Sequence, residues 1–191
     1  DTALAGGGTL RVAIDGPCGS GKSTLAAILR RVYGCSVLPM DHFFLPPALR
    51  TPGRLAEPGG NLDTDRLLAE VAPRLLEGHP VTYRPFDCRI MAPGRPVTLR
   101  PHRLLVLEGS YSLHPKLRDL HDLSIFLRIS PDEQVRRIRA RNGPDGLAAF
   151  MAKWIPMENR YFAFFDIAGH SDLVLRTDRT DMGWADPEKA R

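Results

Sequence analysis

The chain has 191 residues, of which 43% are hydrophobic and 25% are charged. This ordinary globular mixture is long enough for one domain with a sizeable core, and it excludes a chain that is disordered throughout. The net charge is +4, but no long basic run with interleaved aromatic residues occurs, so nucleic acid is not an expected partner.

Membrane and secretory classes also receive no support from the sequence. No apolar stretch approaches the roughly 20 residues that span a membrane, so no membrane contact is expected. The three cysteines form no CxxC pair, which indicates free thiols in a reducing compartment. Residues 1–8 lack an initiator Met and are expected to form a flexible leader rather than a signal peptide, so the expected location is cytoplasmic.

The first predicted elements are a strand and a helix. The apolar run of residues 9–15 predicts a buried strand that ends at Gly16. Helical spacing then predicts a helix over 23–33, which Gly34 ends. Its expected apolar face comprises Leu25, Ile28, Leu29 and Val32.

The second strand is predicted over residues 35–40. Pro39 within this run indicates an edge strand or a strand end, because proline cannot donate to a sheet ladder. Asp41 follows directly, at the carboxyl end of this strand. Residues 46–60 are rich in proline and glycine and are predicted to form a loop.

The middle of the chain predicts a helix, an insertion and a third strand. The helix spans 63–76, and Pro73 is expected to kink it. Residues 80–99 contain several prolines and predict an insertion rich in hairpins. The third buried strand covers 103–107 and ends at Glu108.

The last part of the chain predicts two more strands around two helices. A fourth strand covers 123–129, and an arginine-rich helix covers 131–142. Residues 147–167 are predicted to be helical and interrupted at Pro156, and a fifth strand covers 173–176. Strands that alternate with helices predict a parallel sheet covered on both faces, with the ligand site beyond the carboxyl ends of the strands.

Residues 16–23 read GPCGSGKS and match the pattern G-x-x-x-x-G-K-[ST] between a strand and a helix. In such a P-loop, backbone N–H groups surround a phosphate and the helix N-terminus attracts the same anion. Lys22 can bridge the β- and γ-phosphates of ATP, Ser23 can bind Mg²⁺, and Thr24 can contact the α-phosphate. The expected ATP site comprises Gly16, Pro17, Cys18, Gly19, Ser20, Gly21, Lys22, Ser23 and Thr24.

The motif and the element order together predict an α/β chain with the three-layer P-loop NTPase fold. We expect a central, mostly parallel five-stranded sheet flanked by helices, in a single domain over 1–191. The segment from about 131 to 160 is expected to form a small lid and its adjoining helices.

Two carboxylates at predicted strand ends are candidates for chemistry. Asp41 can orient and deprotonate an acceptor hydroxyl or hold magnesium through water, although a capping aspartate is the alternative. Glu108 ends an apolar strand as in the Walker B arrangement, in which the carboxylate reaches Mg²⁺. Ser23, Glu108 and Asp41 are therefore the candidate metal residues.

Helical spacing and position relative to the motifs indicate further candidate site residues. Arg137 and Arg141 lie four residues apart, so they share a helix face and can neutralise charge in a phosphoryl-transfer transition state. A solvated basic face is the interpretation favoured for Arg136 and Arg139. Asp63 can either contact sugar hydroxyls or cap a helix.

Several short motifs follow one another along the chain and precede the arginine helix: DGPCGSGKSTLA, MDHFF, NLDTDRL, YRPFD and LEGSY. From residue 11 to about residue 175 this order resembles the uridine kinase and phosphoribulokinase group of P-loop kinases, and in particular a bacterial uridine kinase-like subgroup. The resemblance implies ATP-dependent phosphorylation of a hydroxyl on a small sugar-containing acceptor, most of all a nucleoside such as uridine. The cofactors it implies are ATP and Mg²⁺.

The resemblance also implies roles for single residues. Asp41 would be the catalytic base, Asp63 the ribose contact and Tyr83 the aromatic residue near the nucleobase. Glu108 would join Ser23 at magnesium. The chain departs from the family's nucleoside kinases in lacking a histidine a few residues beyond this tyrosine.

Two other functions are compatible with the same residues. A nucleoside monophosphate kinase accepts a phosphate and needs no base, and the arginines support that alternative. A P-loop nucleotide-binding regulator without turnover is the second. A GTPase is disfavoured, because no asparagine is followed by lysine as in N-K-x-D. The sequence leaves open whether the chain forms a homo-oligomer.

Overall fold

The computed structural model describes residues 8–100 and 102–178. Its centre is a five-stranded sheet in the order β2-β7-β1-β8-β9, in which every pairing is parallel. The strands are β2 (Ser36–Pro39), β7 (Leu104–Glu108), β1 (Leu10–Asp15), β8 (Leu123–Arg128) and β9 (Leu173–Arg176). This arrangement confirms the predicted sheet, and β2 is an edge strand, as Pro39 indicated.

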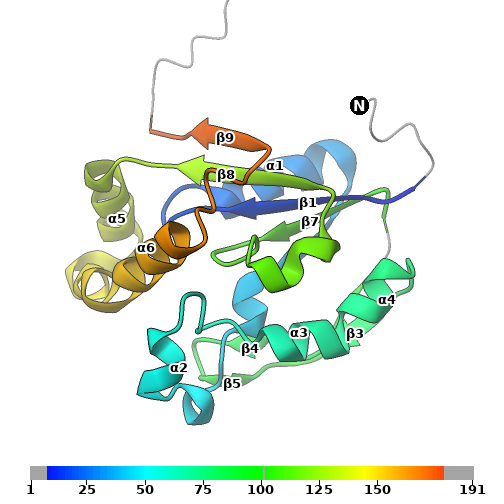
Figure 1. Cartoon of the computed structure of the whole chain (residues 1–191), viewed down its shortest axis with the longest axis horizontal. Coiled ribbons are helices and arrows are strands. Elements are labelled where there is room, and N and C mark those ends of the chain that lie inside the picture. Colours follow the sequence, from blue (N-terminus) through cyan, green and yellow to red (C-terminus); the bar gives the residue numbers. More distant parts are fainter. Residues whose placement is uncertain (1–7, 101, 179–191) are drawn as a thin grey trace, which may run out of the picture.

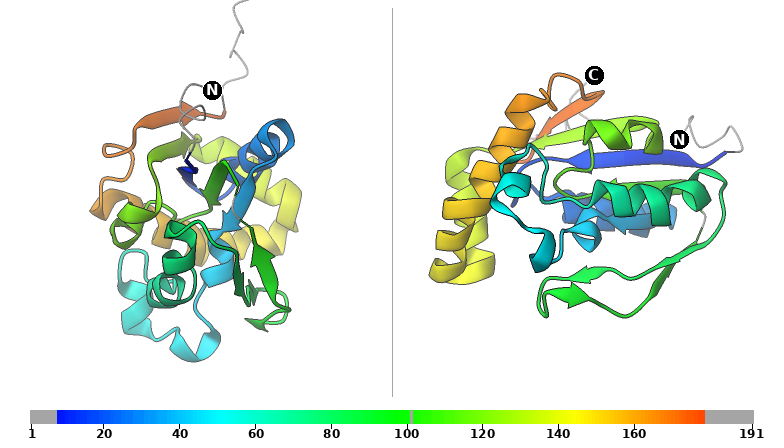
Figure 2. Two further views of the ribbon diagram at one scale, coloured as in Figure 1. Left: turned by 90° about the vertical axis from the view of Figure 1, so that its right-hand side faces the viewer. Right: turned by 60° about the horizontal axis from the view of Figure 1, so that its bottom comes forward.

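Alternate residues of the central strands face opposite sides of the sheet, and each side carries its own apolar core. Figure 1 and the left view of Figure 2 show α1 on one side of the sheet and α3 and α6 on the other. The helices are α1 (Lys22–Tyr33), α2 (Pro52–Ala56), α3 (Thr64–Glu70), α4 (Ala72–Leu76), α5 (Pro131–Ala149) and α6 (Ile155–Phe164). Helices on both faces of a parallel sheet make the three layers that were expected.

The predicted apolar face of the first helix is wrong at two of its four residues. Ile28 and Val32 are 46% and 62% exposed. Leu25, Ala26 and Leu29 pack against the core instead. A helix that covers a sheet with one side buries a stripe narrower than the whole apolar face, which explains the difference.

The segment after β2, predicted to be a loop, contains helical structure. Residues 46–60 contain the short helix α2, which Thr51 caps by accepting a hydrogen bond from the Arg54 N–H. The helix predicted over 63–76 is divided into α3 and α4 near Pro73, where the missing N–H prevents continuation. Residues 80–99 form the expected hairpins. They contain β3 (Val81–Tyr83) paired with β6 (Val97–Leu99) and β4 (Phe86–Asp87) paired with β5 (Ala92–Pro93).

The segment from α5 to α6 is almost continuously helical. A kink at Gly143, which was not predicted, interrupts α5, and a π-helical turn over Phe150–Trp154 joins α5 to α6. Pro156 lies in the first turn of α6, so the predicted interruption is placed just before it. Across the described residues, no helix combines the length and apolarity that a membrane crossing requires. Residues 1–7 of the expected leader lie outside the described ranges.

Candidate active site

The P-loop connects β1 to α1 at the carboxyl edge of the sheet. Gly16 has a φ of 142°, and a Cβ at this position would lie 2.4 Å from the Leu127 carbonyl oxygen on β8. Only glycine allows the loop to leave β1 so close to the neighbouring strand. The loop thus places the N-terminus of α1 at the edge where the other strands of the sheet end.

Lys22 lies inside this loop. It is 8% exposed, and its Nζ donates hydrogen bonds to the carbonyl oxygens of Gly16 at 2.6 Å and Pro17 at 3.0 Å. The ammonium is therefore held within the curve of the loop, where a bound phosphate would meet it together with the first amides of α1. These residues fit the phosphates of ATP.

Ser23 and Glu108, two of the three candidate metal residues, lie in contact with each other. The Ser23 hydroxyl lies 3.2 Å from both carboxylate oxygens of Glu108. Oxygen donors of this kind suit Mg²⁺, which usually takes one or two protein ligands and completes its shell with water and phosphate. Within 8–100 and 102–178 there is no cluster of three or more His, Cys, Asp or Glu side chains that could hold a metal ion.

Asp41 lies beside this pair. The β2–β7 register sets Pro39 opposite Glu108, and Asp41 follows two residues later in a short 3₁₀ turn over Met40–Phe43. Burial raises the pKa of Glu108, Lys22 opposes this shift, and the charge of Asp41 adds to it. The register therefore places Asp41 at the same edge of the sheet as Glu108.

The two side chains expected to contact the acceptor, Tyr83 and Asp63, have hydrogen-bond partners within the protein. Tyr83 is 5% exposed, and its hydroxyl lies 3.0 Å from His42 Nδ1. Asp63 caps α3, because its Oδ1 accepts a hydrogen bond from the Arg66 N–H at 3.1 Å. Capping uses one carboxylate oxygen, so a sugar contact through the other oxygen stays a prediction.

Arg137 reaches the P-loop, whereas Arg141 does not. The Arg137 guanidinium donates to the Gly19 carbonyl oxygen at 3.2 Å and also pairs with Glu133 at 2.7 Å. In the described part of the chain, Arg141 contacts Asn142 and lies over the Phe150 ring. The kink at Gly143 follows directly, so regular helical spacing could not predict the surroundings of Arg141.

Sequence reasoning missed Asp15, the last residue of β1. It is fully buried, and its carboxylate accepts hydrogen bonds from the N–H groups of Gly16 at 2.7 Å, Tyr111 at 3.1 Å and Leu113 at 3.0 Å, and from the Tyr161 hydroxyl at 2.9 Å. Burial raises the pKa of Asp15 to about 6, against the lowering effect of its donors. An acidic residue at the end of an apolar run was a usable signal.

Glu158 on α6 was also missed, and it has no comparable signal in the sequence. It is 6% exposed, and its carboxylate accepts hydrogen bonds from the Cys18 N–H at 2.8 Å and the Ser110 hydroxyl at 2.6 Å. Burial, together with Glu158, raises the pKa of the Cys18 thiol to about 12, which agrees with an inert thiol.

The chain has the fold of the P-loop kinases. It is similar to a protein from Bacillus stearothermophilus described as a possible uridine kinase, with a TM-score of 0.69 and 20% identity over 88% of this chain and 89% of the other. A protein from Silicibacter sp. assigned as a fructose transport system kinase gives a TM-score of 0.64 and 24% identity over 88% and 90% of the two chains.

A third structure with the P-loop kinase fold is YFH7 from Saccharomyces cerevisiae, assigned as a P-loop kinase with a circular permutation. Its TM-score is 0.63 at 12% identity, and the similarity covers 90% of this chain and 93% of the other. No protein-family model matches the chain, and no curated protein matches it. Identities this low support the fold, and the acceptor has to be argued from the residues.

Proposed function

We propose that this protein is an ATP-dependent kinase that transfers the γ-phosphate of ATP to a hydroxyl of a small acceptor. The observation that supports this most strongly is the placement of Asp41 beside Glu108, with Lys22 and Ser23 on the adjoining P-loop. A carboxylate next to a phosphate and metal site can orient an acceptor hydroxyl and take its proton. A monophosphate acceptor needs no such group.

Each residue has a defined part in this proposal. The P-loop amides and Lys22 bind the phosphates, and Lys22 stabilises the charge that develops on the transferred group. Mg²⁺, held by Ser23 and Glu108, would neutralise phosphate charge. Asp41 positions the acceptor hydroxyl and accepts its proton. The segment over 131–160 acts as a lid that excludes water, which would otherwise compete as acceptor.

We propose a nucleoside such as uridine as the acceptor. The resemblance of the segments around Asp41, Asp63 and Tyr83 to uridine kinases supports this choice. Asp63 would contact the ribose. Tyr83 would lie near the nucleobase, with its hydroxyl group beside His42. Arg137 would stabilise the phosphates from α5, while Arg141 would need the lid to move before it could contribute.

The test is magnesium-dependent ADP release from ATP with a panel of acceptors: uridine, cytidine, other nucleosides, nucleoside monophosphates, ribulose 5-phosphate and pantothenate. We expect one nucleoside to stimulate release strongly. Asp41→Asn should keep ATP binding but lose at least about 100-fold in kcat, the usual contribution of a general base. Asp65→Asn, which changes an exposed aspartate, is the matched control.

Other outcomes would contradict parts of the proposal. Stimulation by a monophosphate, with Asp41→Asn fully active, would favour a nucleoside monophosphate kinase. Loss of both ATP binding and activity in Asp41→Asn would give Asp41 a structural role. Binding of ATP without turnover of any acceptor would favour a regulator.

A further inference from the structure

Glu158 joins three segments that are far apart in the sequence. It lies on α6, 140 residues from Cys18 and 48 residues from Ser110, and one carboxylate oxygen accepts from each. A buried carboxylate is tolerated only when hydrogen bonds replace its lost hydration, so these contacts are strongly preferred over other arrangements. They attach the first half of the P-loop to α6 and to the loop that follows β7.

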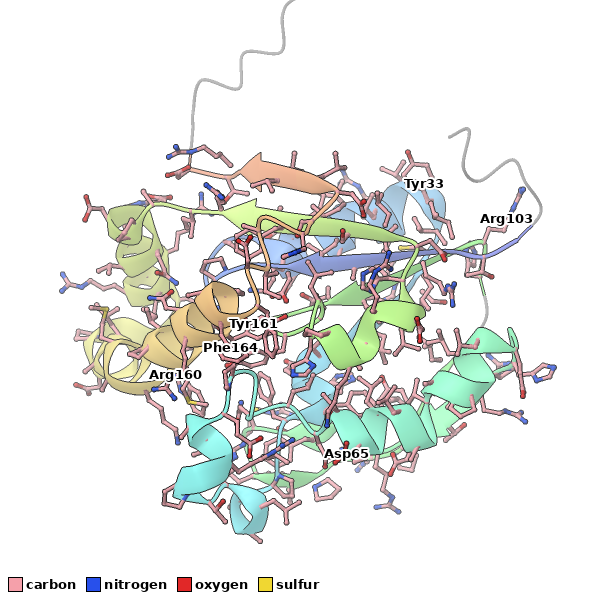
Figure 3. All side chains as sticks on the ribbon, viewed as in Figure 1. Tyr33, Asp65, Arg103, Arg160, Tyr161 and Phe164 are labelled. Atoms are coloured by element: carbon pink, nitrogen blue, oxygen red, sulfur yellow. The ribbon has the colours of Figure 1, made fainter. Side chains whose placement is uncertain are left out.

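A second α6 side chain reinforces the same attachment. Tyr161 lies three residues after Glu158, on the same face of the helix, and is labelled on α6 in Figure 3. Its hydroxyl donates to Asp15, which in turn accepts the Gly16 N–H. One turn of α6 thus contacts Cys18 directly and the start of the P-loop through Asp15.

The lid side of the molecule contacts the next residues of the loop. Gln134 on α5 donates through Nε2 to the Cys18 carbonyl oxygen at 2.9 Å, and Arg137 donates to the Gly19 carbonyl oxygen. Cys18 is therefore held by its N–H and by its carbonyl oxygen. The amides that begin at the N-terminus of α1 remain for phosphate, because the first N–H groups of a helix have no partner within it.

We propose that Glu158 is a positioning residue of phosphoryl transfer, which holds the first half of the P-loop in register with α6 and with the loop after Glu108. This inference rests on the proposed kinase function. Phosphoryl transfer depends on placing the γ-phosphate in line with the acceptor, so a small displacement of the loop lowers the rate more than it lowers nucleotide affinity. Glu158 acts through Cys18 and does not itself touch the reacting atoms.

The chain offers a matched pair of substitutions for a test. Glu158→Gln keeps the size of the side chain. Its carbonyl oxygen can accept from the Cys18 N–H, while its NH₂ group donates to the Ser110 hydroxyl, which can reverse its role. Glu158→Ala removes both contacts. Glu77→Ala, which removes an exposed glutamate at the C-cap of α4, is the control.

Three experiments are made: nucleotide binding, which gives the Kd of a fluorescent ADP analogue; steady-state kinetics, which gives kcat and KM for ATP with the stimulating acceptor; and hydrogen–deuterium exchange of the peptide that carries residues 16–22. In Glu158→Ala we expect kcat to fall about tenfold or more, while Kd changes less than about threefold and the P-loop peptide exchanges about tenfold faster. In Glu158→Gln, kcat, Kd and the exchange rate should all be close to those of the wild type. Glu77→Ala should change none of them.

Two results would overturn the proposal. Wild-type kcat and exchange in Glu158→Ala would show that the contact positions nothing, and a Glu158→Gln protein as slow as Glu158→Ala would show that charge matters rather than hydrogen-bond geometry. If the wild-type protein turns over no acceptor, the kinase assignment fails separately. The exchange measurement then decides alone whether Glu158 holds the loop.

Discussion

Lys22 is held by the P-loop itself. Its ammonium is bound by two carbonyl oxygens of the loop that it serves, which keeps a strongly hydrated charge in a nearly buried place. The side chain thus has a structural part in shaping the loop as well as the expected part in phosphate binding. Residues of this kind lose both functions when they are truncated.

Asp15 gives a pH-dependent prediction at the same scale. Its pKa is raised from 3.8 to about 6 in the folded protein, so the folded state binds the proton more tightly than the unfolded state does. The stabilisation from this group is complete below pH 3.8 and is lost as the pH rises through about 6, by about 3 kcal/mol in total. Asp15→Asn removes this titration.

The prediction is checked by urea unfolding of the wild type and Asp15→Asn between pH 4 and pH 7. The stability of the wild type relative to the variant should decrease as the pH rises. Any constant cost of the amide, which cannot accept all four hydrogen bonds, cancels from this trend. A difference between the two proteins that does not change with pH would contradict the raised pKa.

At the scale of elements, the segment from α5 to α6 is the least regular part of the fold. Gly143 has φ 72° and ψ 179°, a conformation that is almost restricted to glycine, and a π-helical turn follows it before Pro156. The kink ends the regular part of α5 that contacts the P-loop, and it lets the chain return through α6. The bend that brings Glu158 to Cys18 therefore depends on local backbone geometry.

Gly143→Ala tests this bend. A Cβ at this position would meet no atom within 4 Å, so any loss of stability comes from the backbone conformation alone. We expect a loss of about 1–3 kcal/mol in the free energy of unfolding, measured by urea denaturation. Gly53→Ala in α2 is the control, because that position is also open, and it should be neutral or more stable by up to about 1 kcal/mol. Equal effects of the two substitutions would rule out strain at Gly143.

At the scale of the whole molecule, the P-loop is the point where the sheet, α1, α5 and α6 meet. A ligand that binds there should stabilise the whole domain, because it binds only the folded chain. We expect MgATP at 100 times its Kd to add about 2.7 kcal/mol to the stability, seen as a rise in Tm. Removal of magnesium with EDTA should reduce this rise.

Lys22→Ala supplies the comparison for that experiment. It should remove most of the rise in Tm with MgATP, whereas Lys116→Ala, which changes an exposed lysine, should keep it. An unchanged response in Lys22→Ala would place nucleotide binding outside the P-loop. A response to GTP equal to that with ATP would show that the site does not discriminate between the two bases.

Local sequence determined the strands, the P-loop and the strand ends that hold Asp41 and Glu108. Apolar runs and a glycine loop depend on neighbouring residues, and parallel strands end at one edge of a sheet. Only the tertiary structure decided the partners of Asp15 and Glu158, the separation of Arg137 from Arg141, and the exposure of Ile28 and Val32. These features depend on contacts between segments more than 40 residues apart or on a backbone kink, and neither helical spacing nor motif matching contains that information.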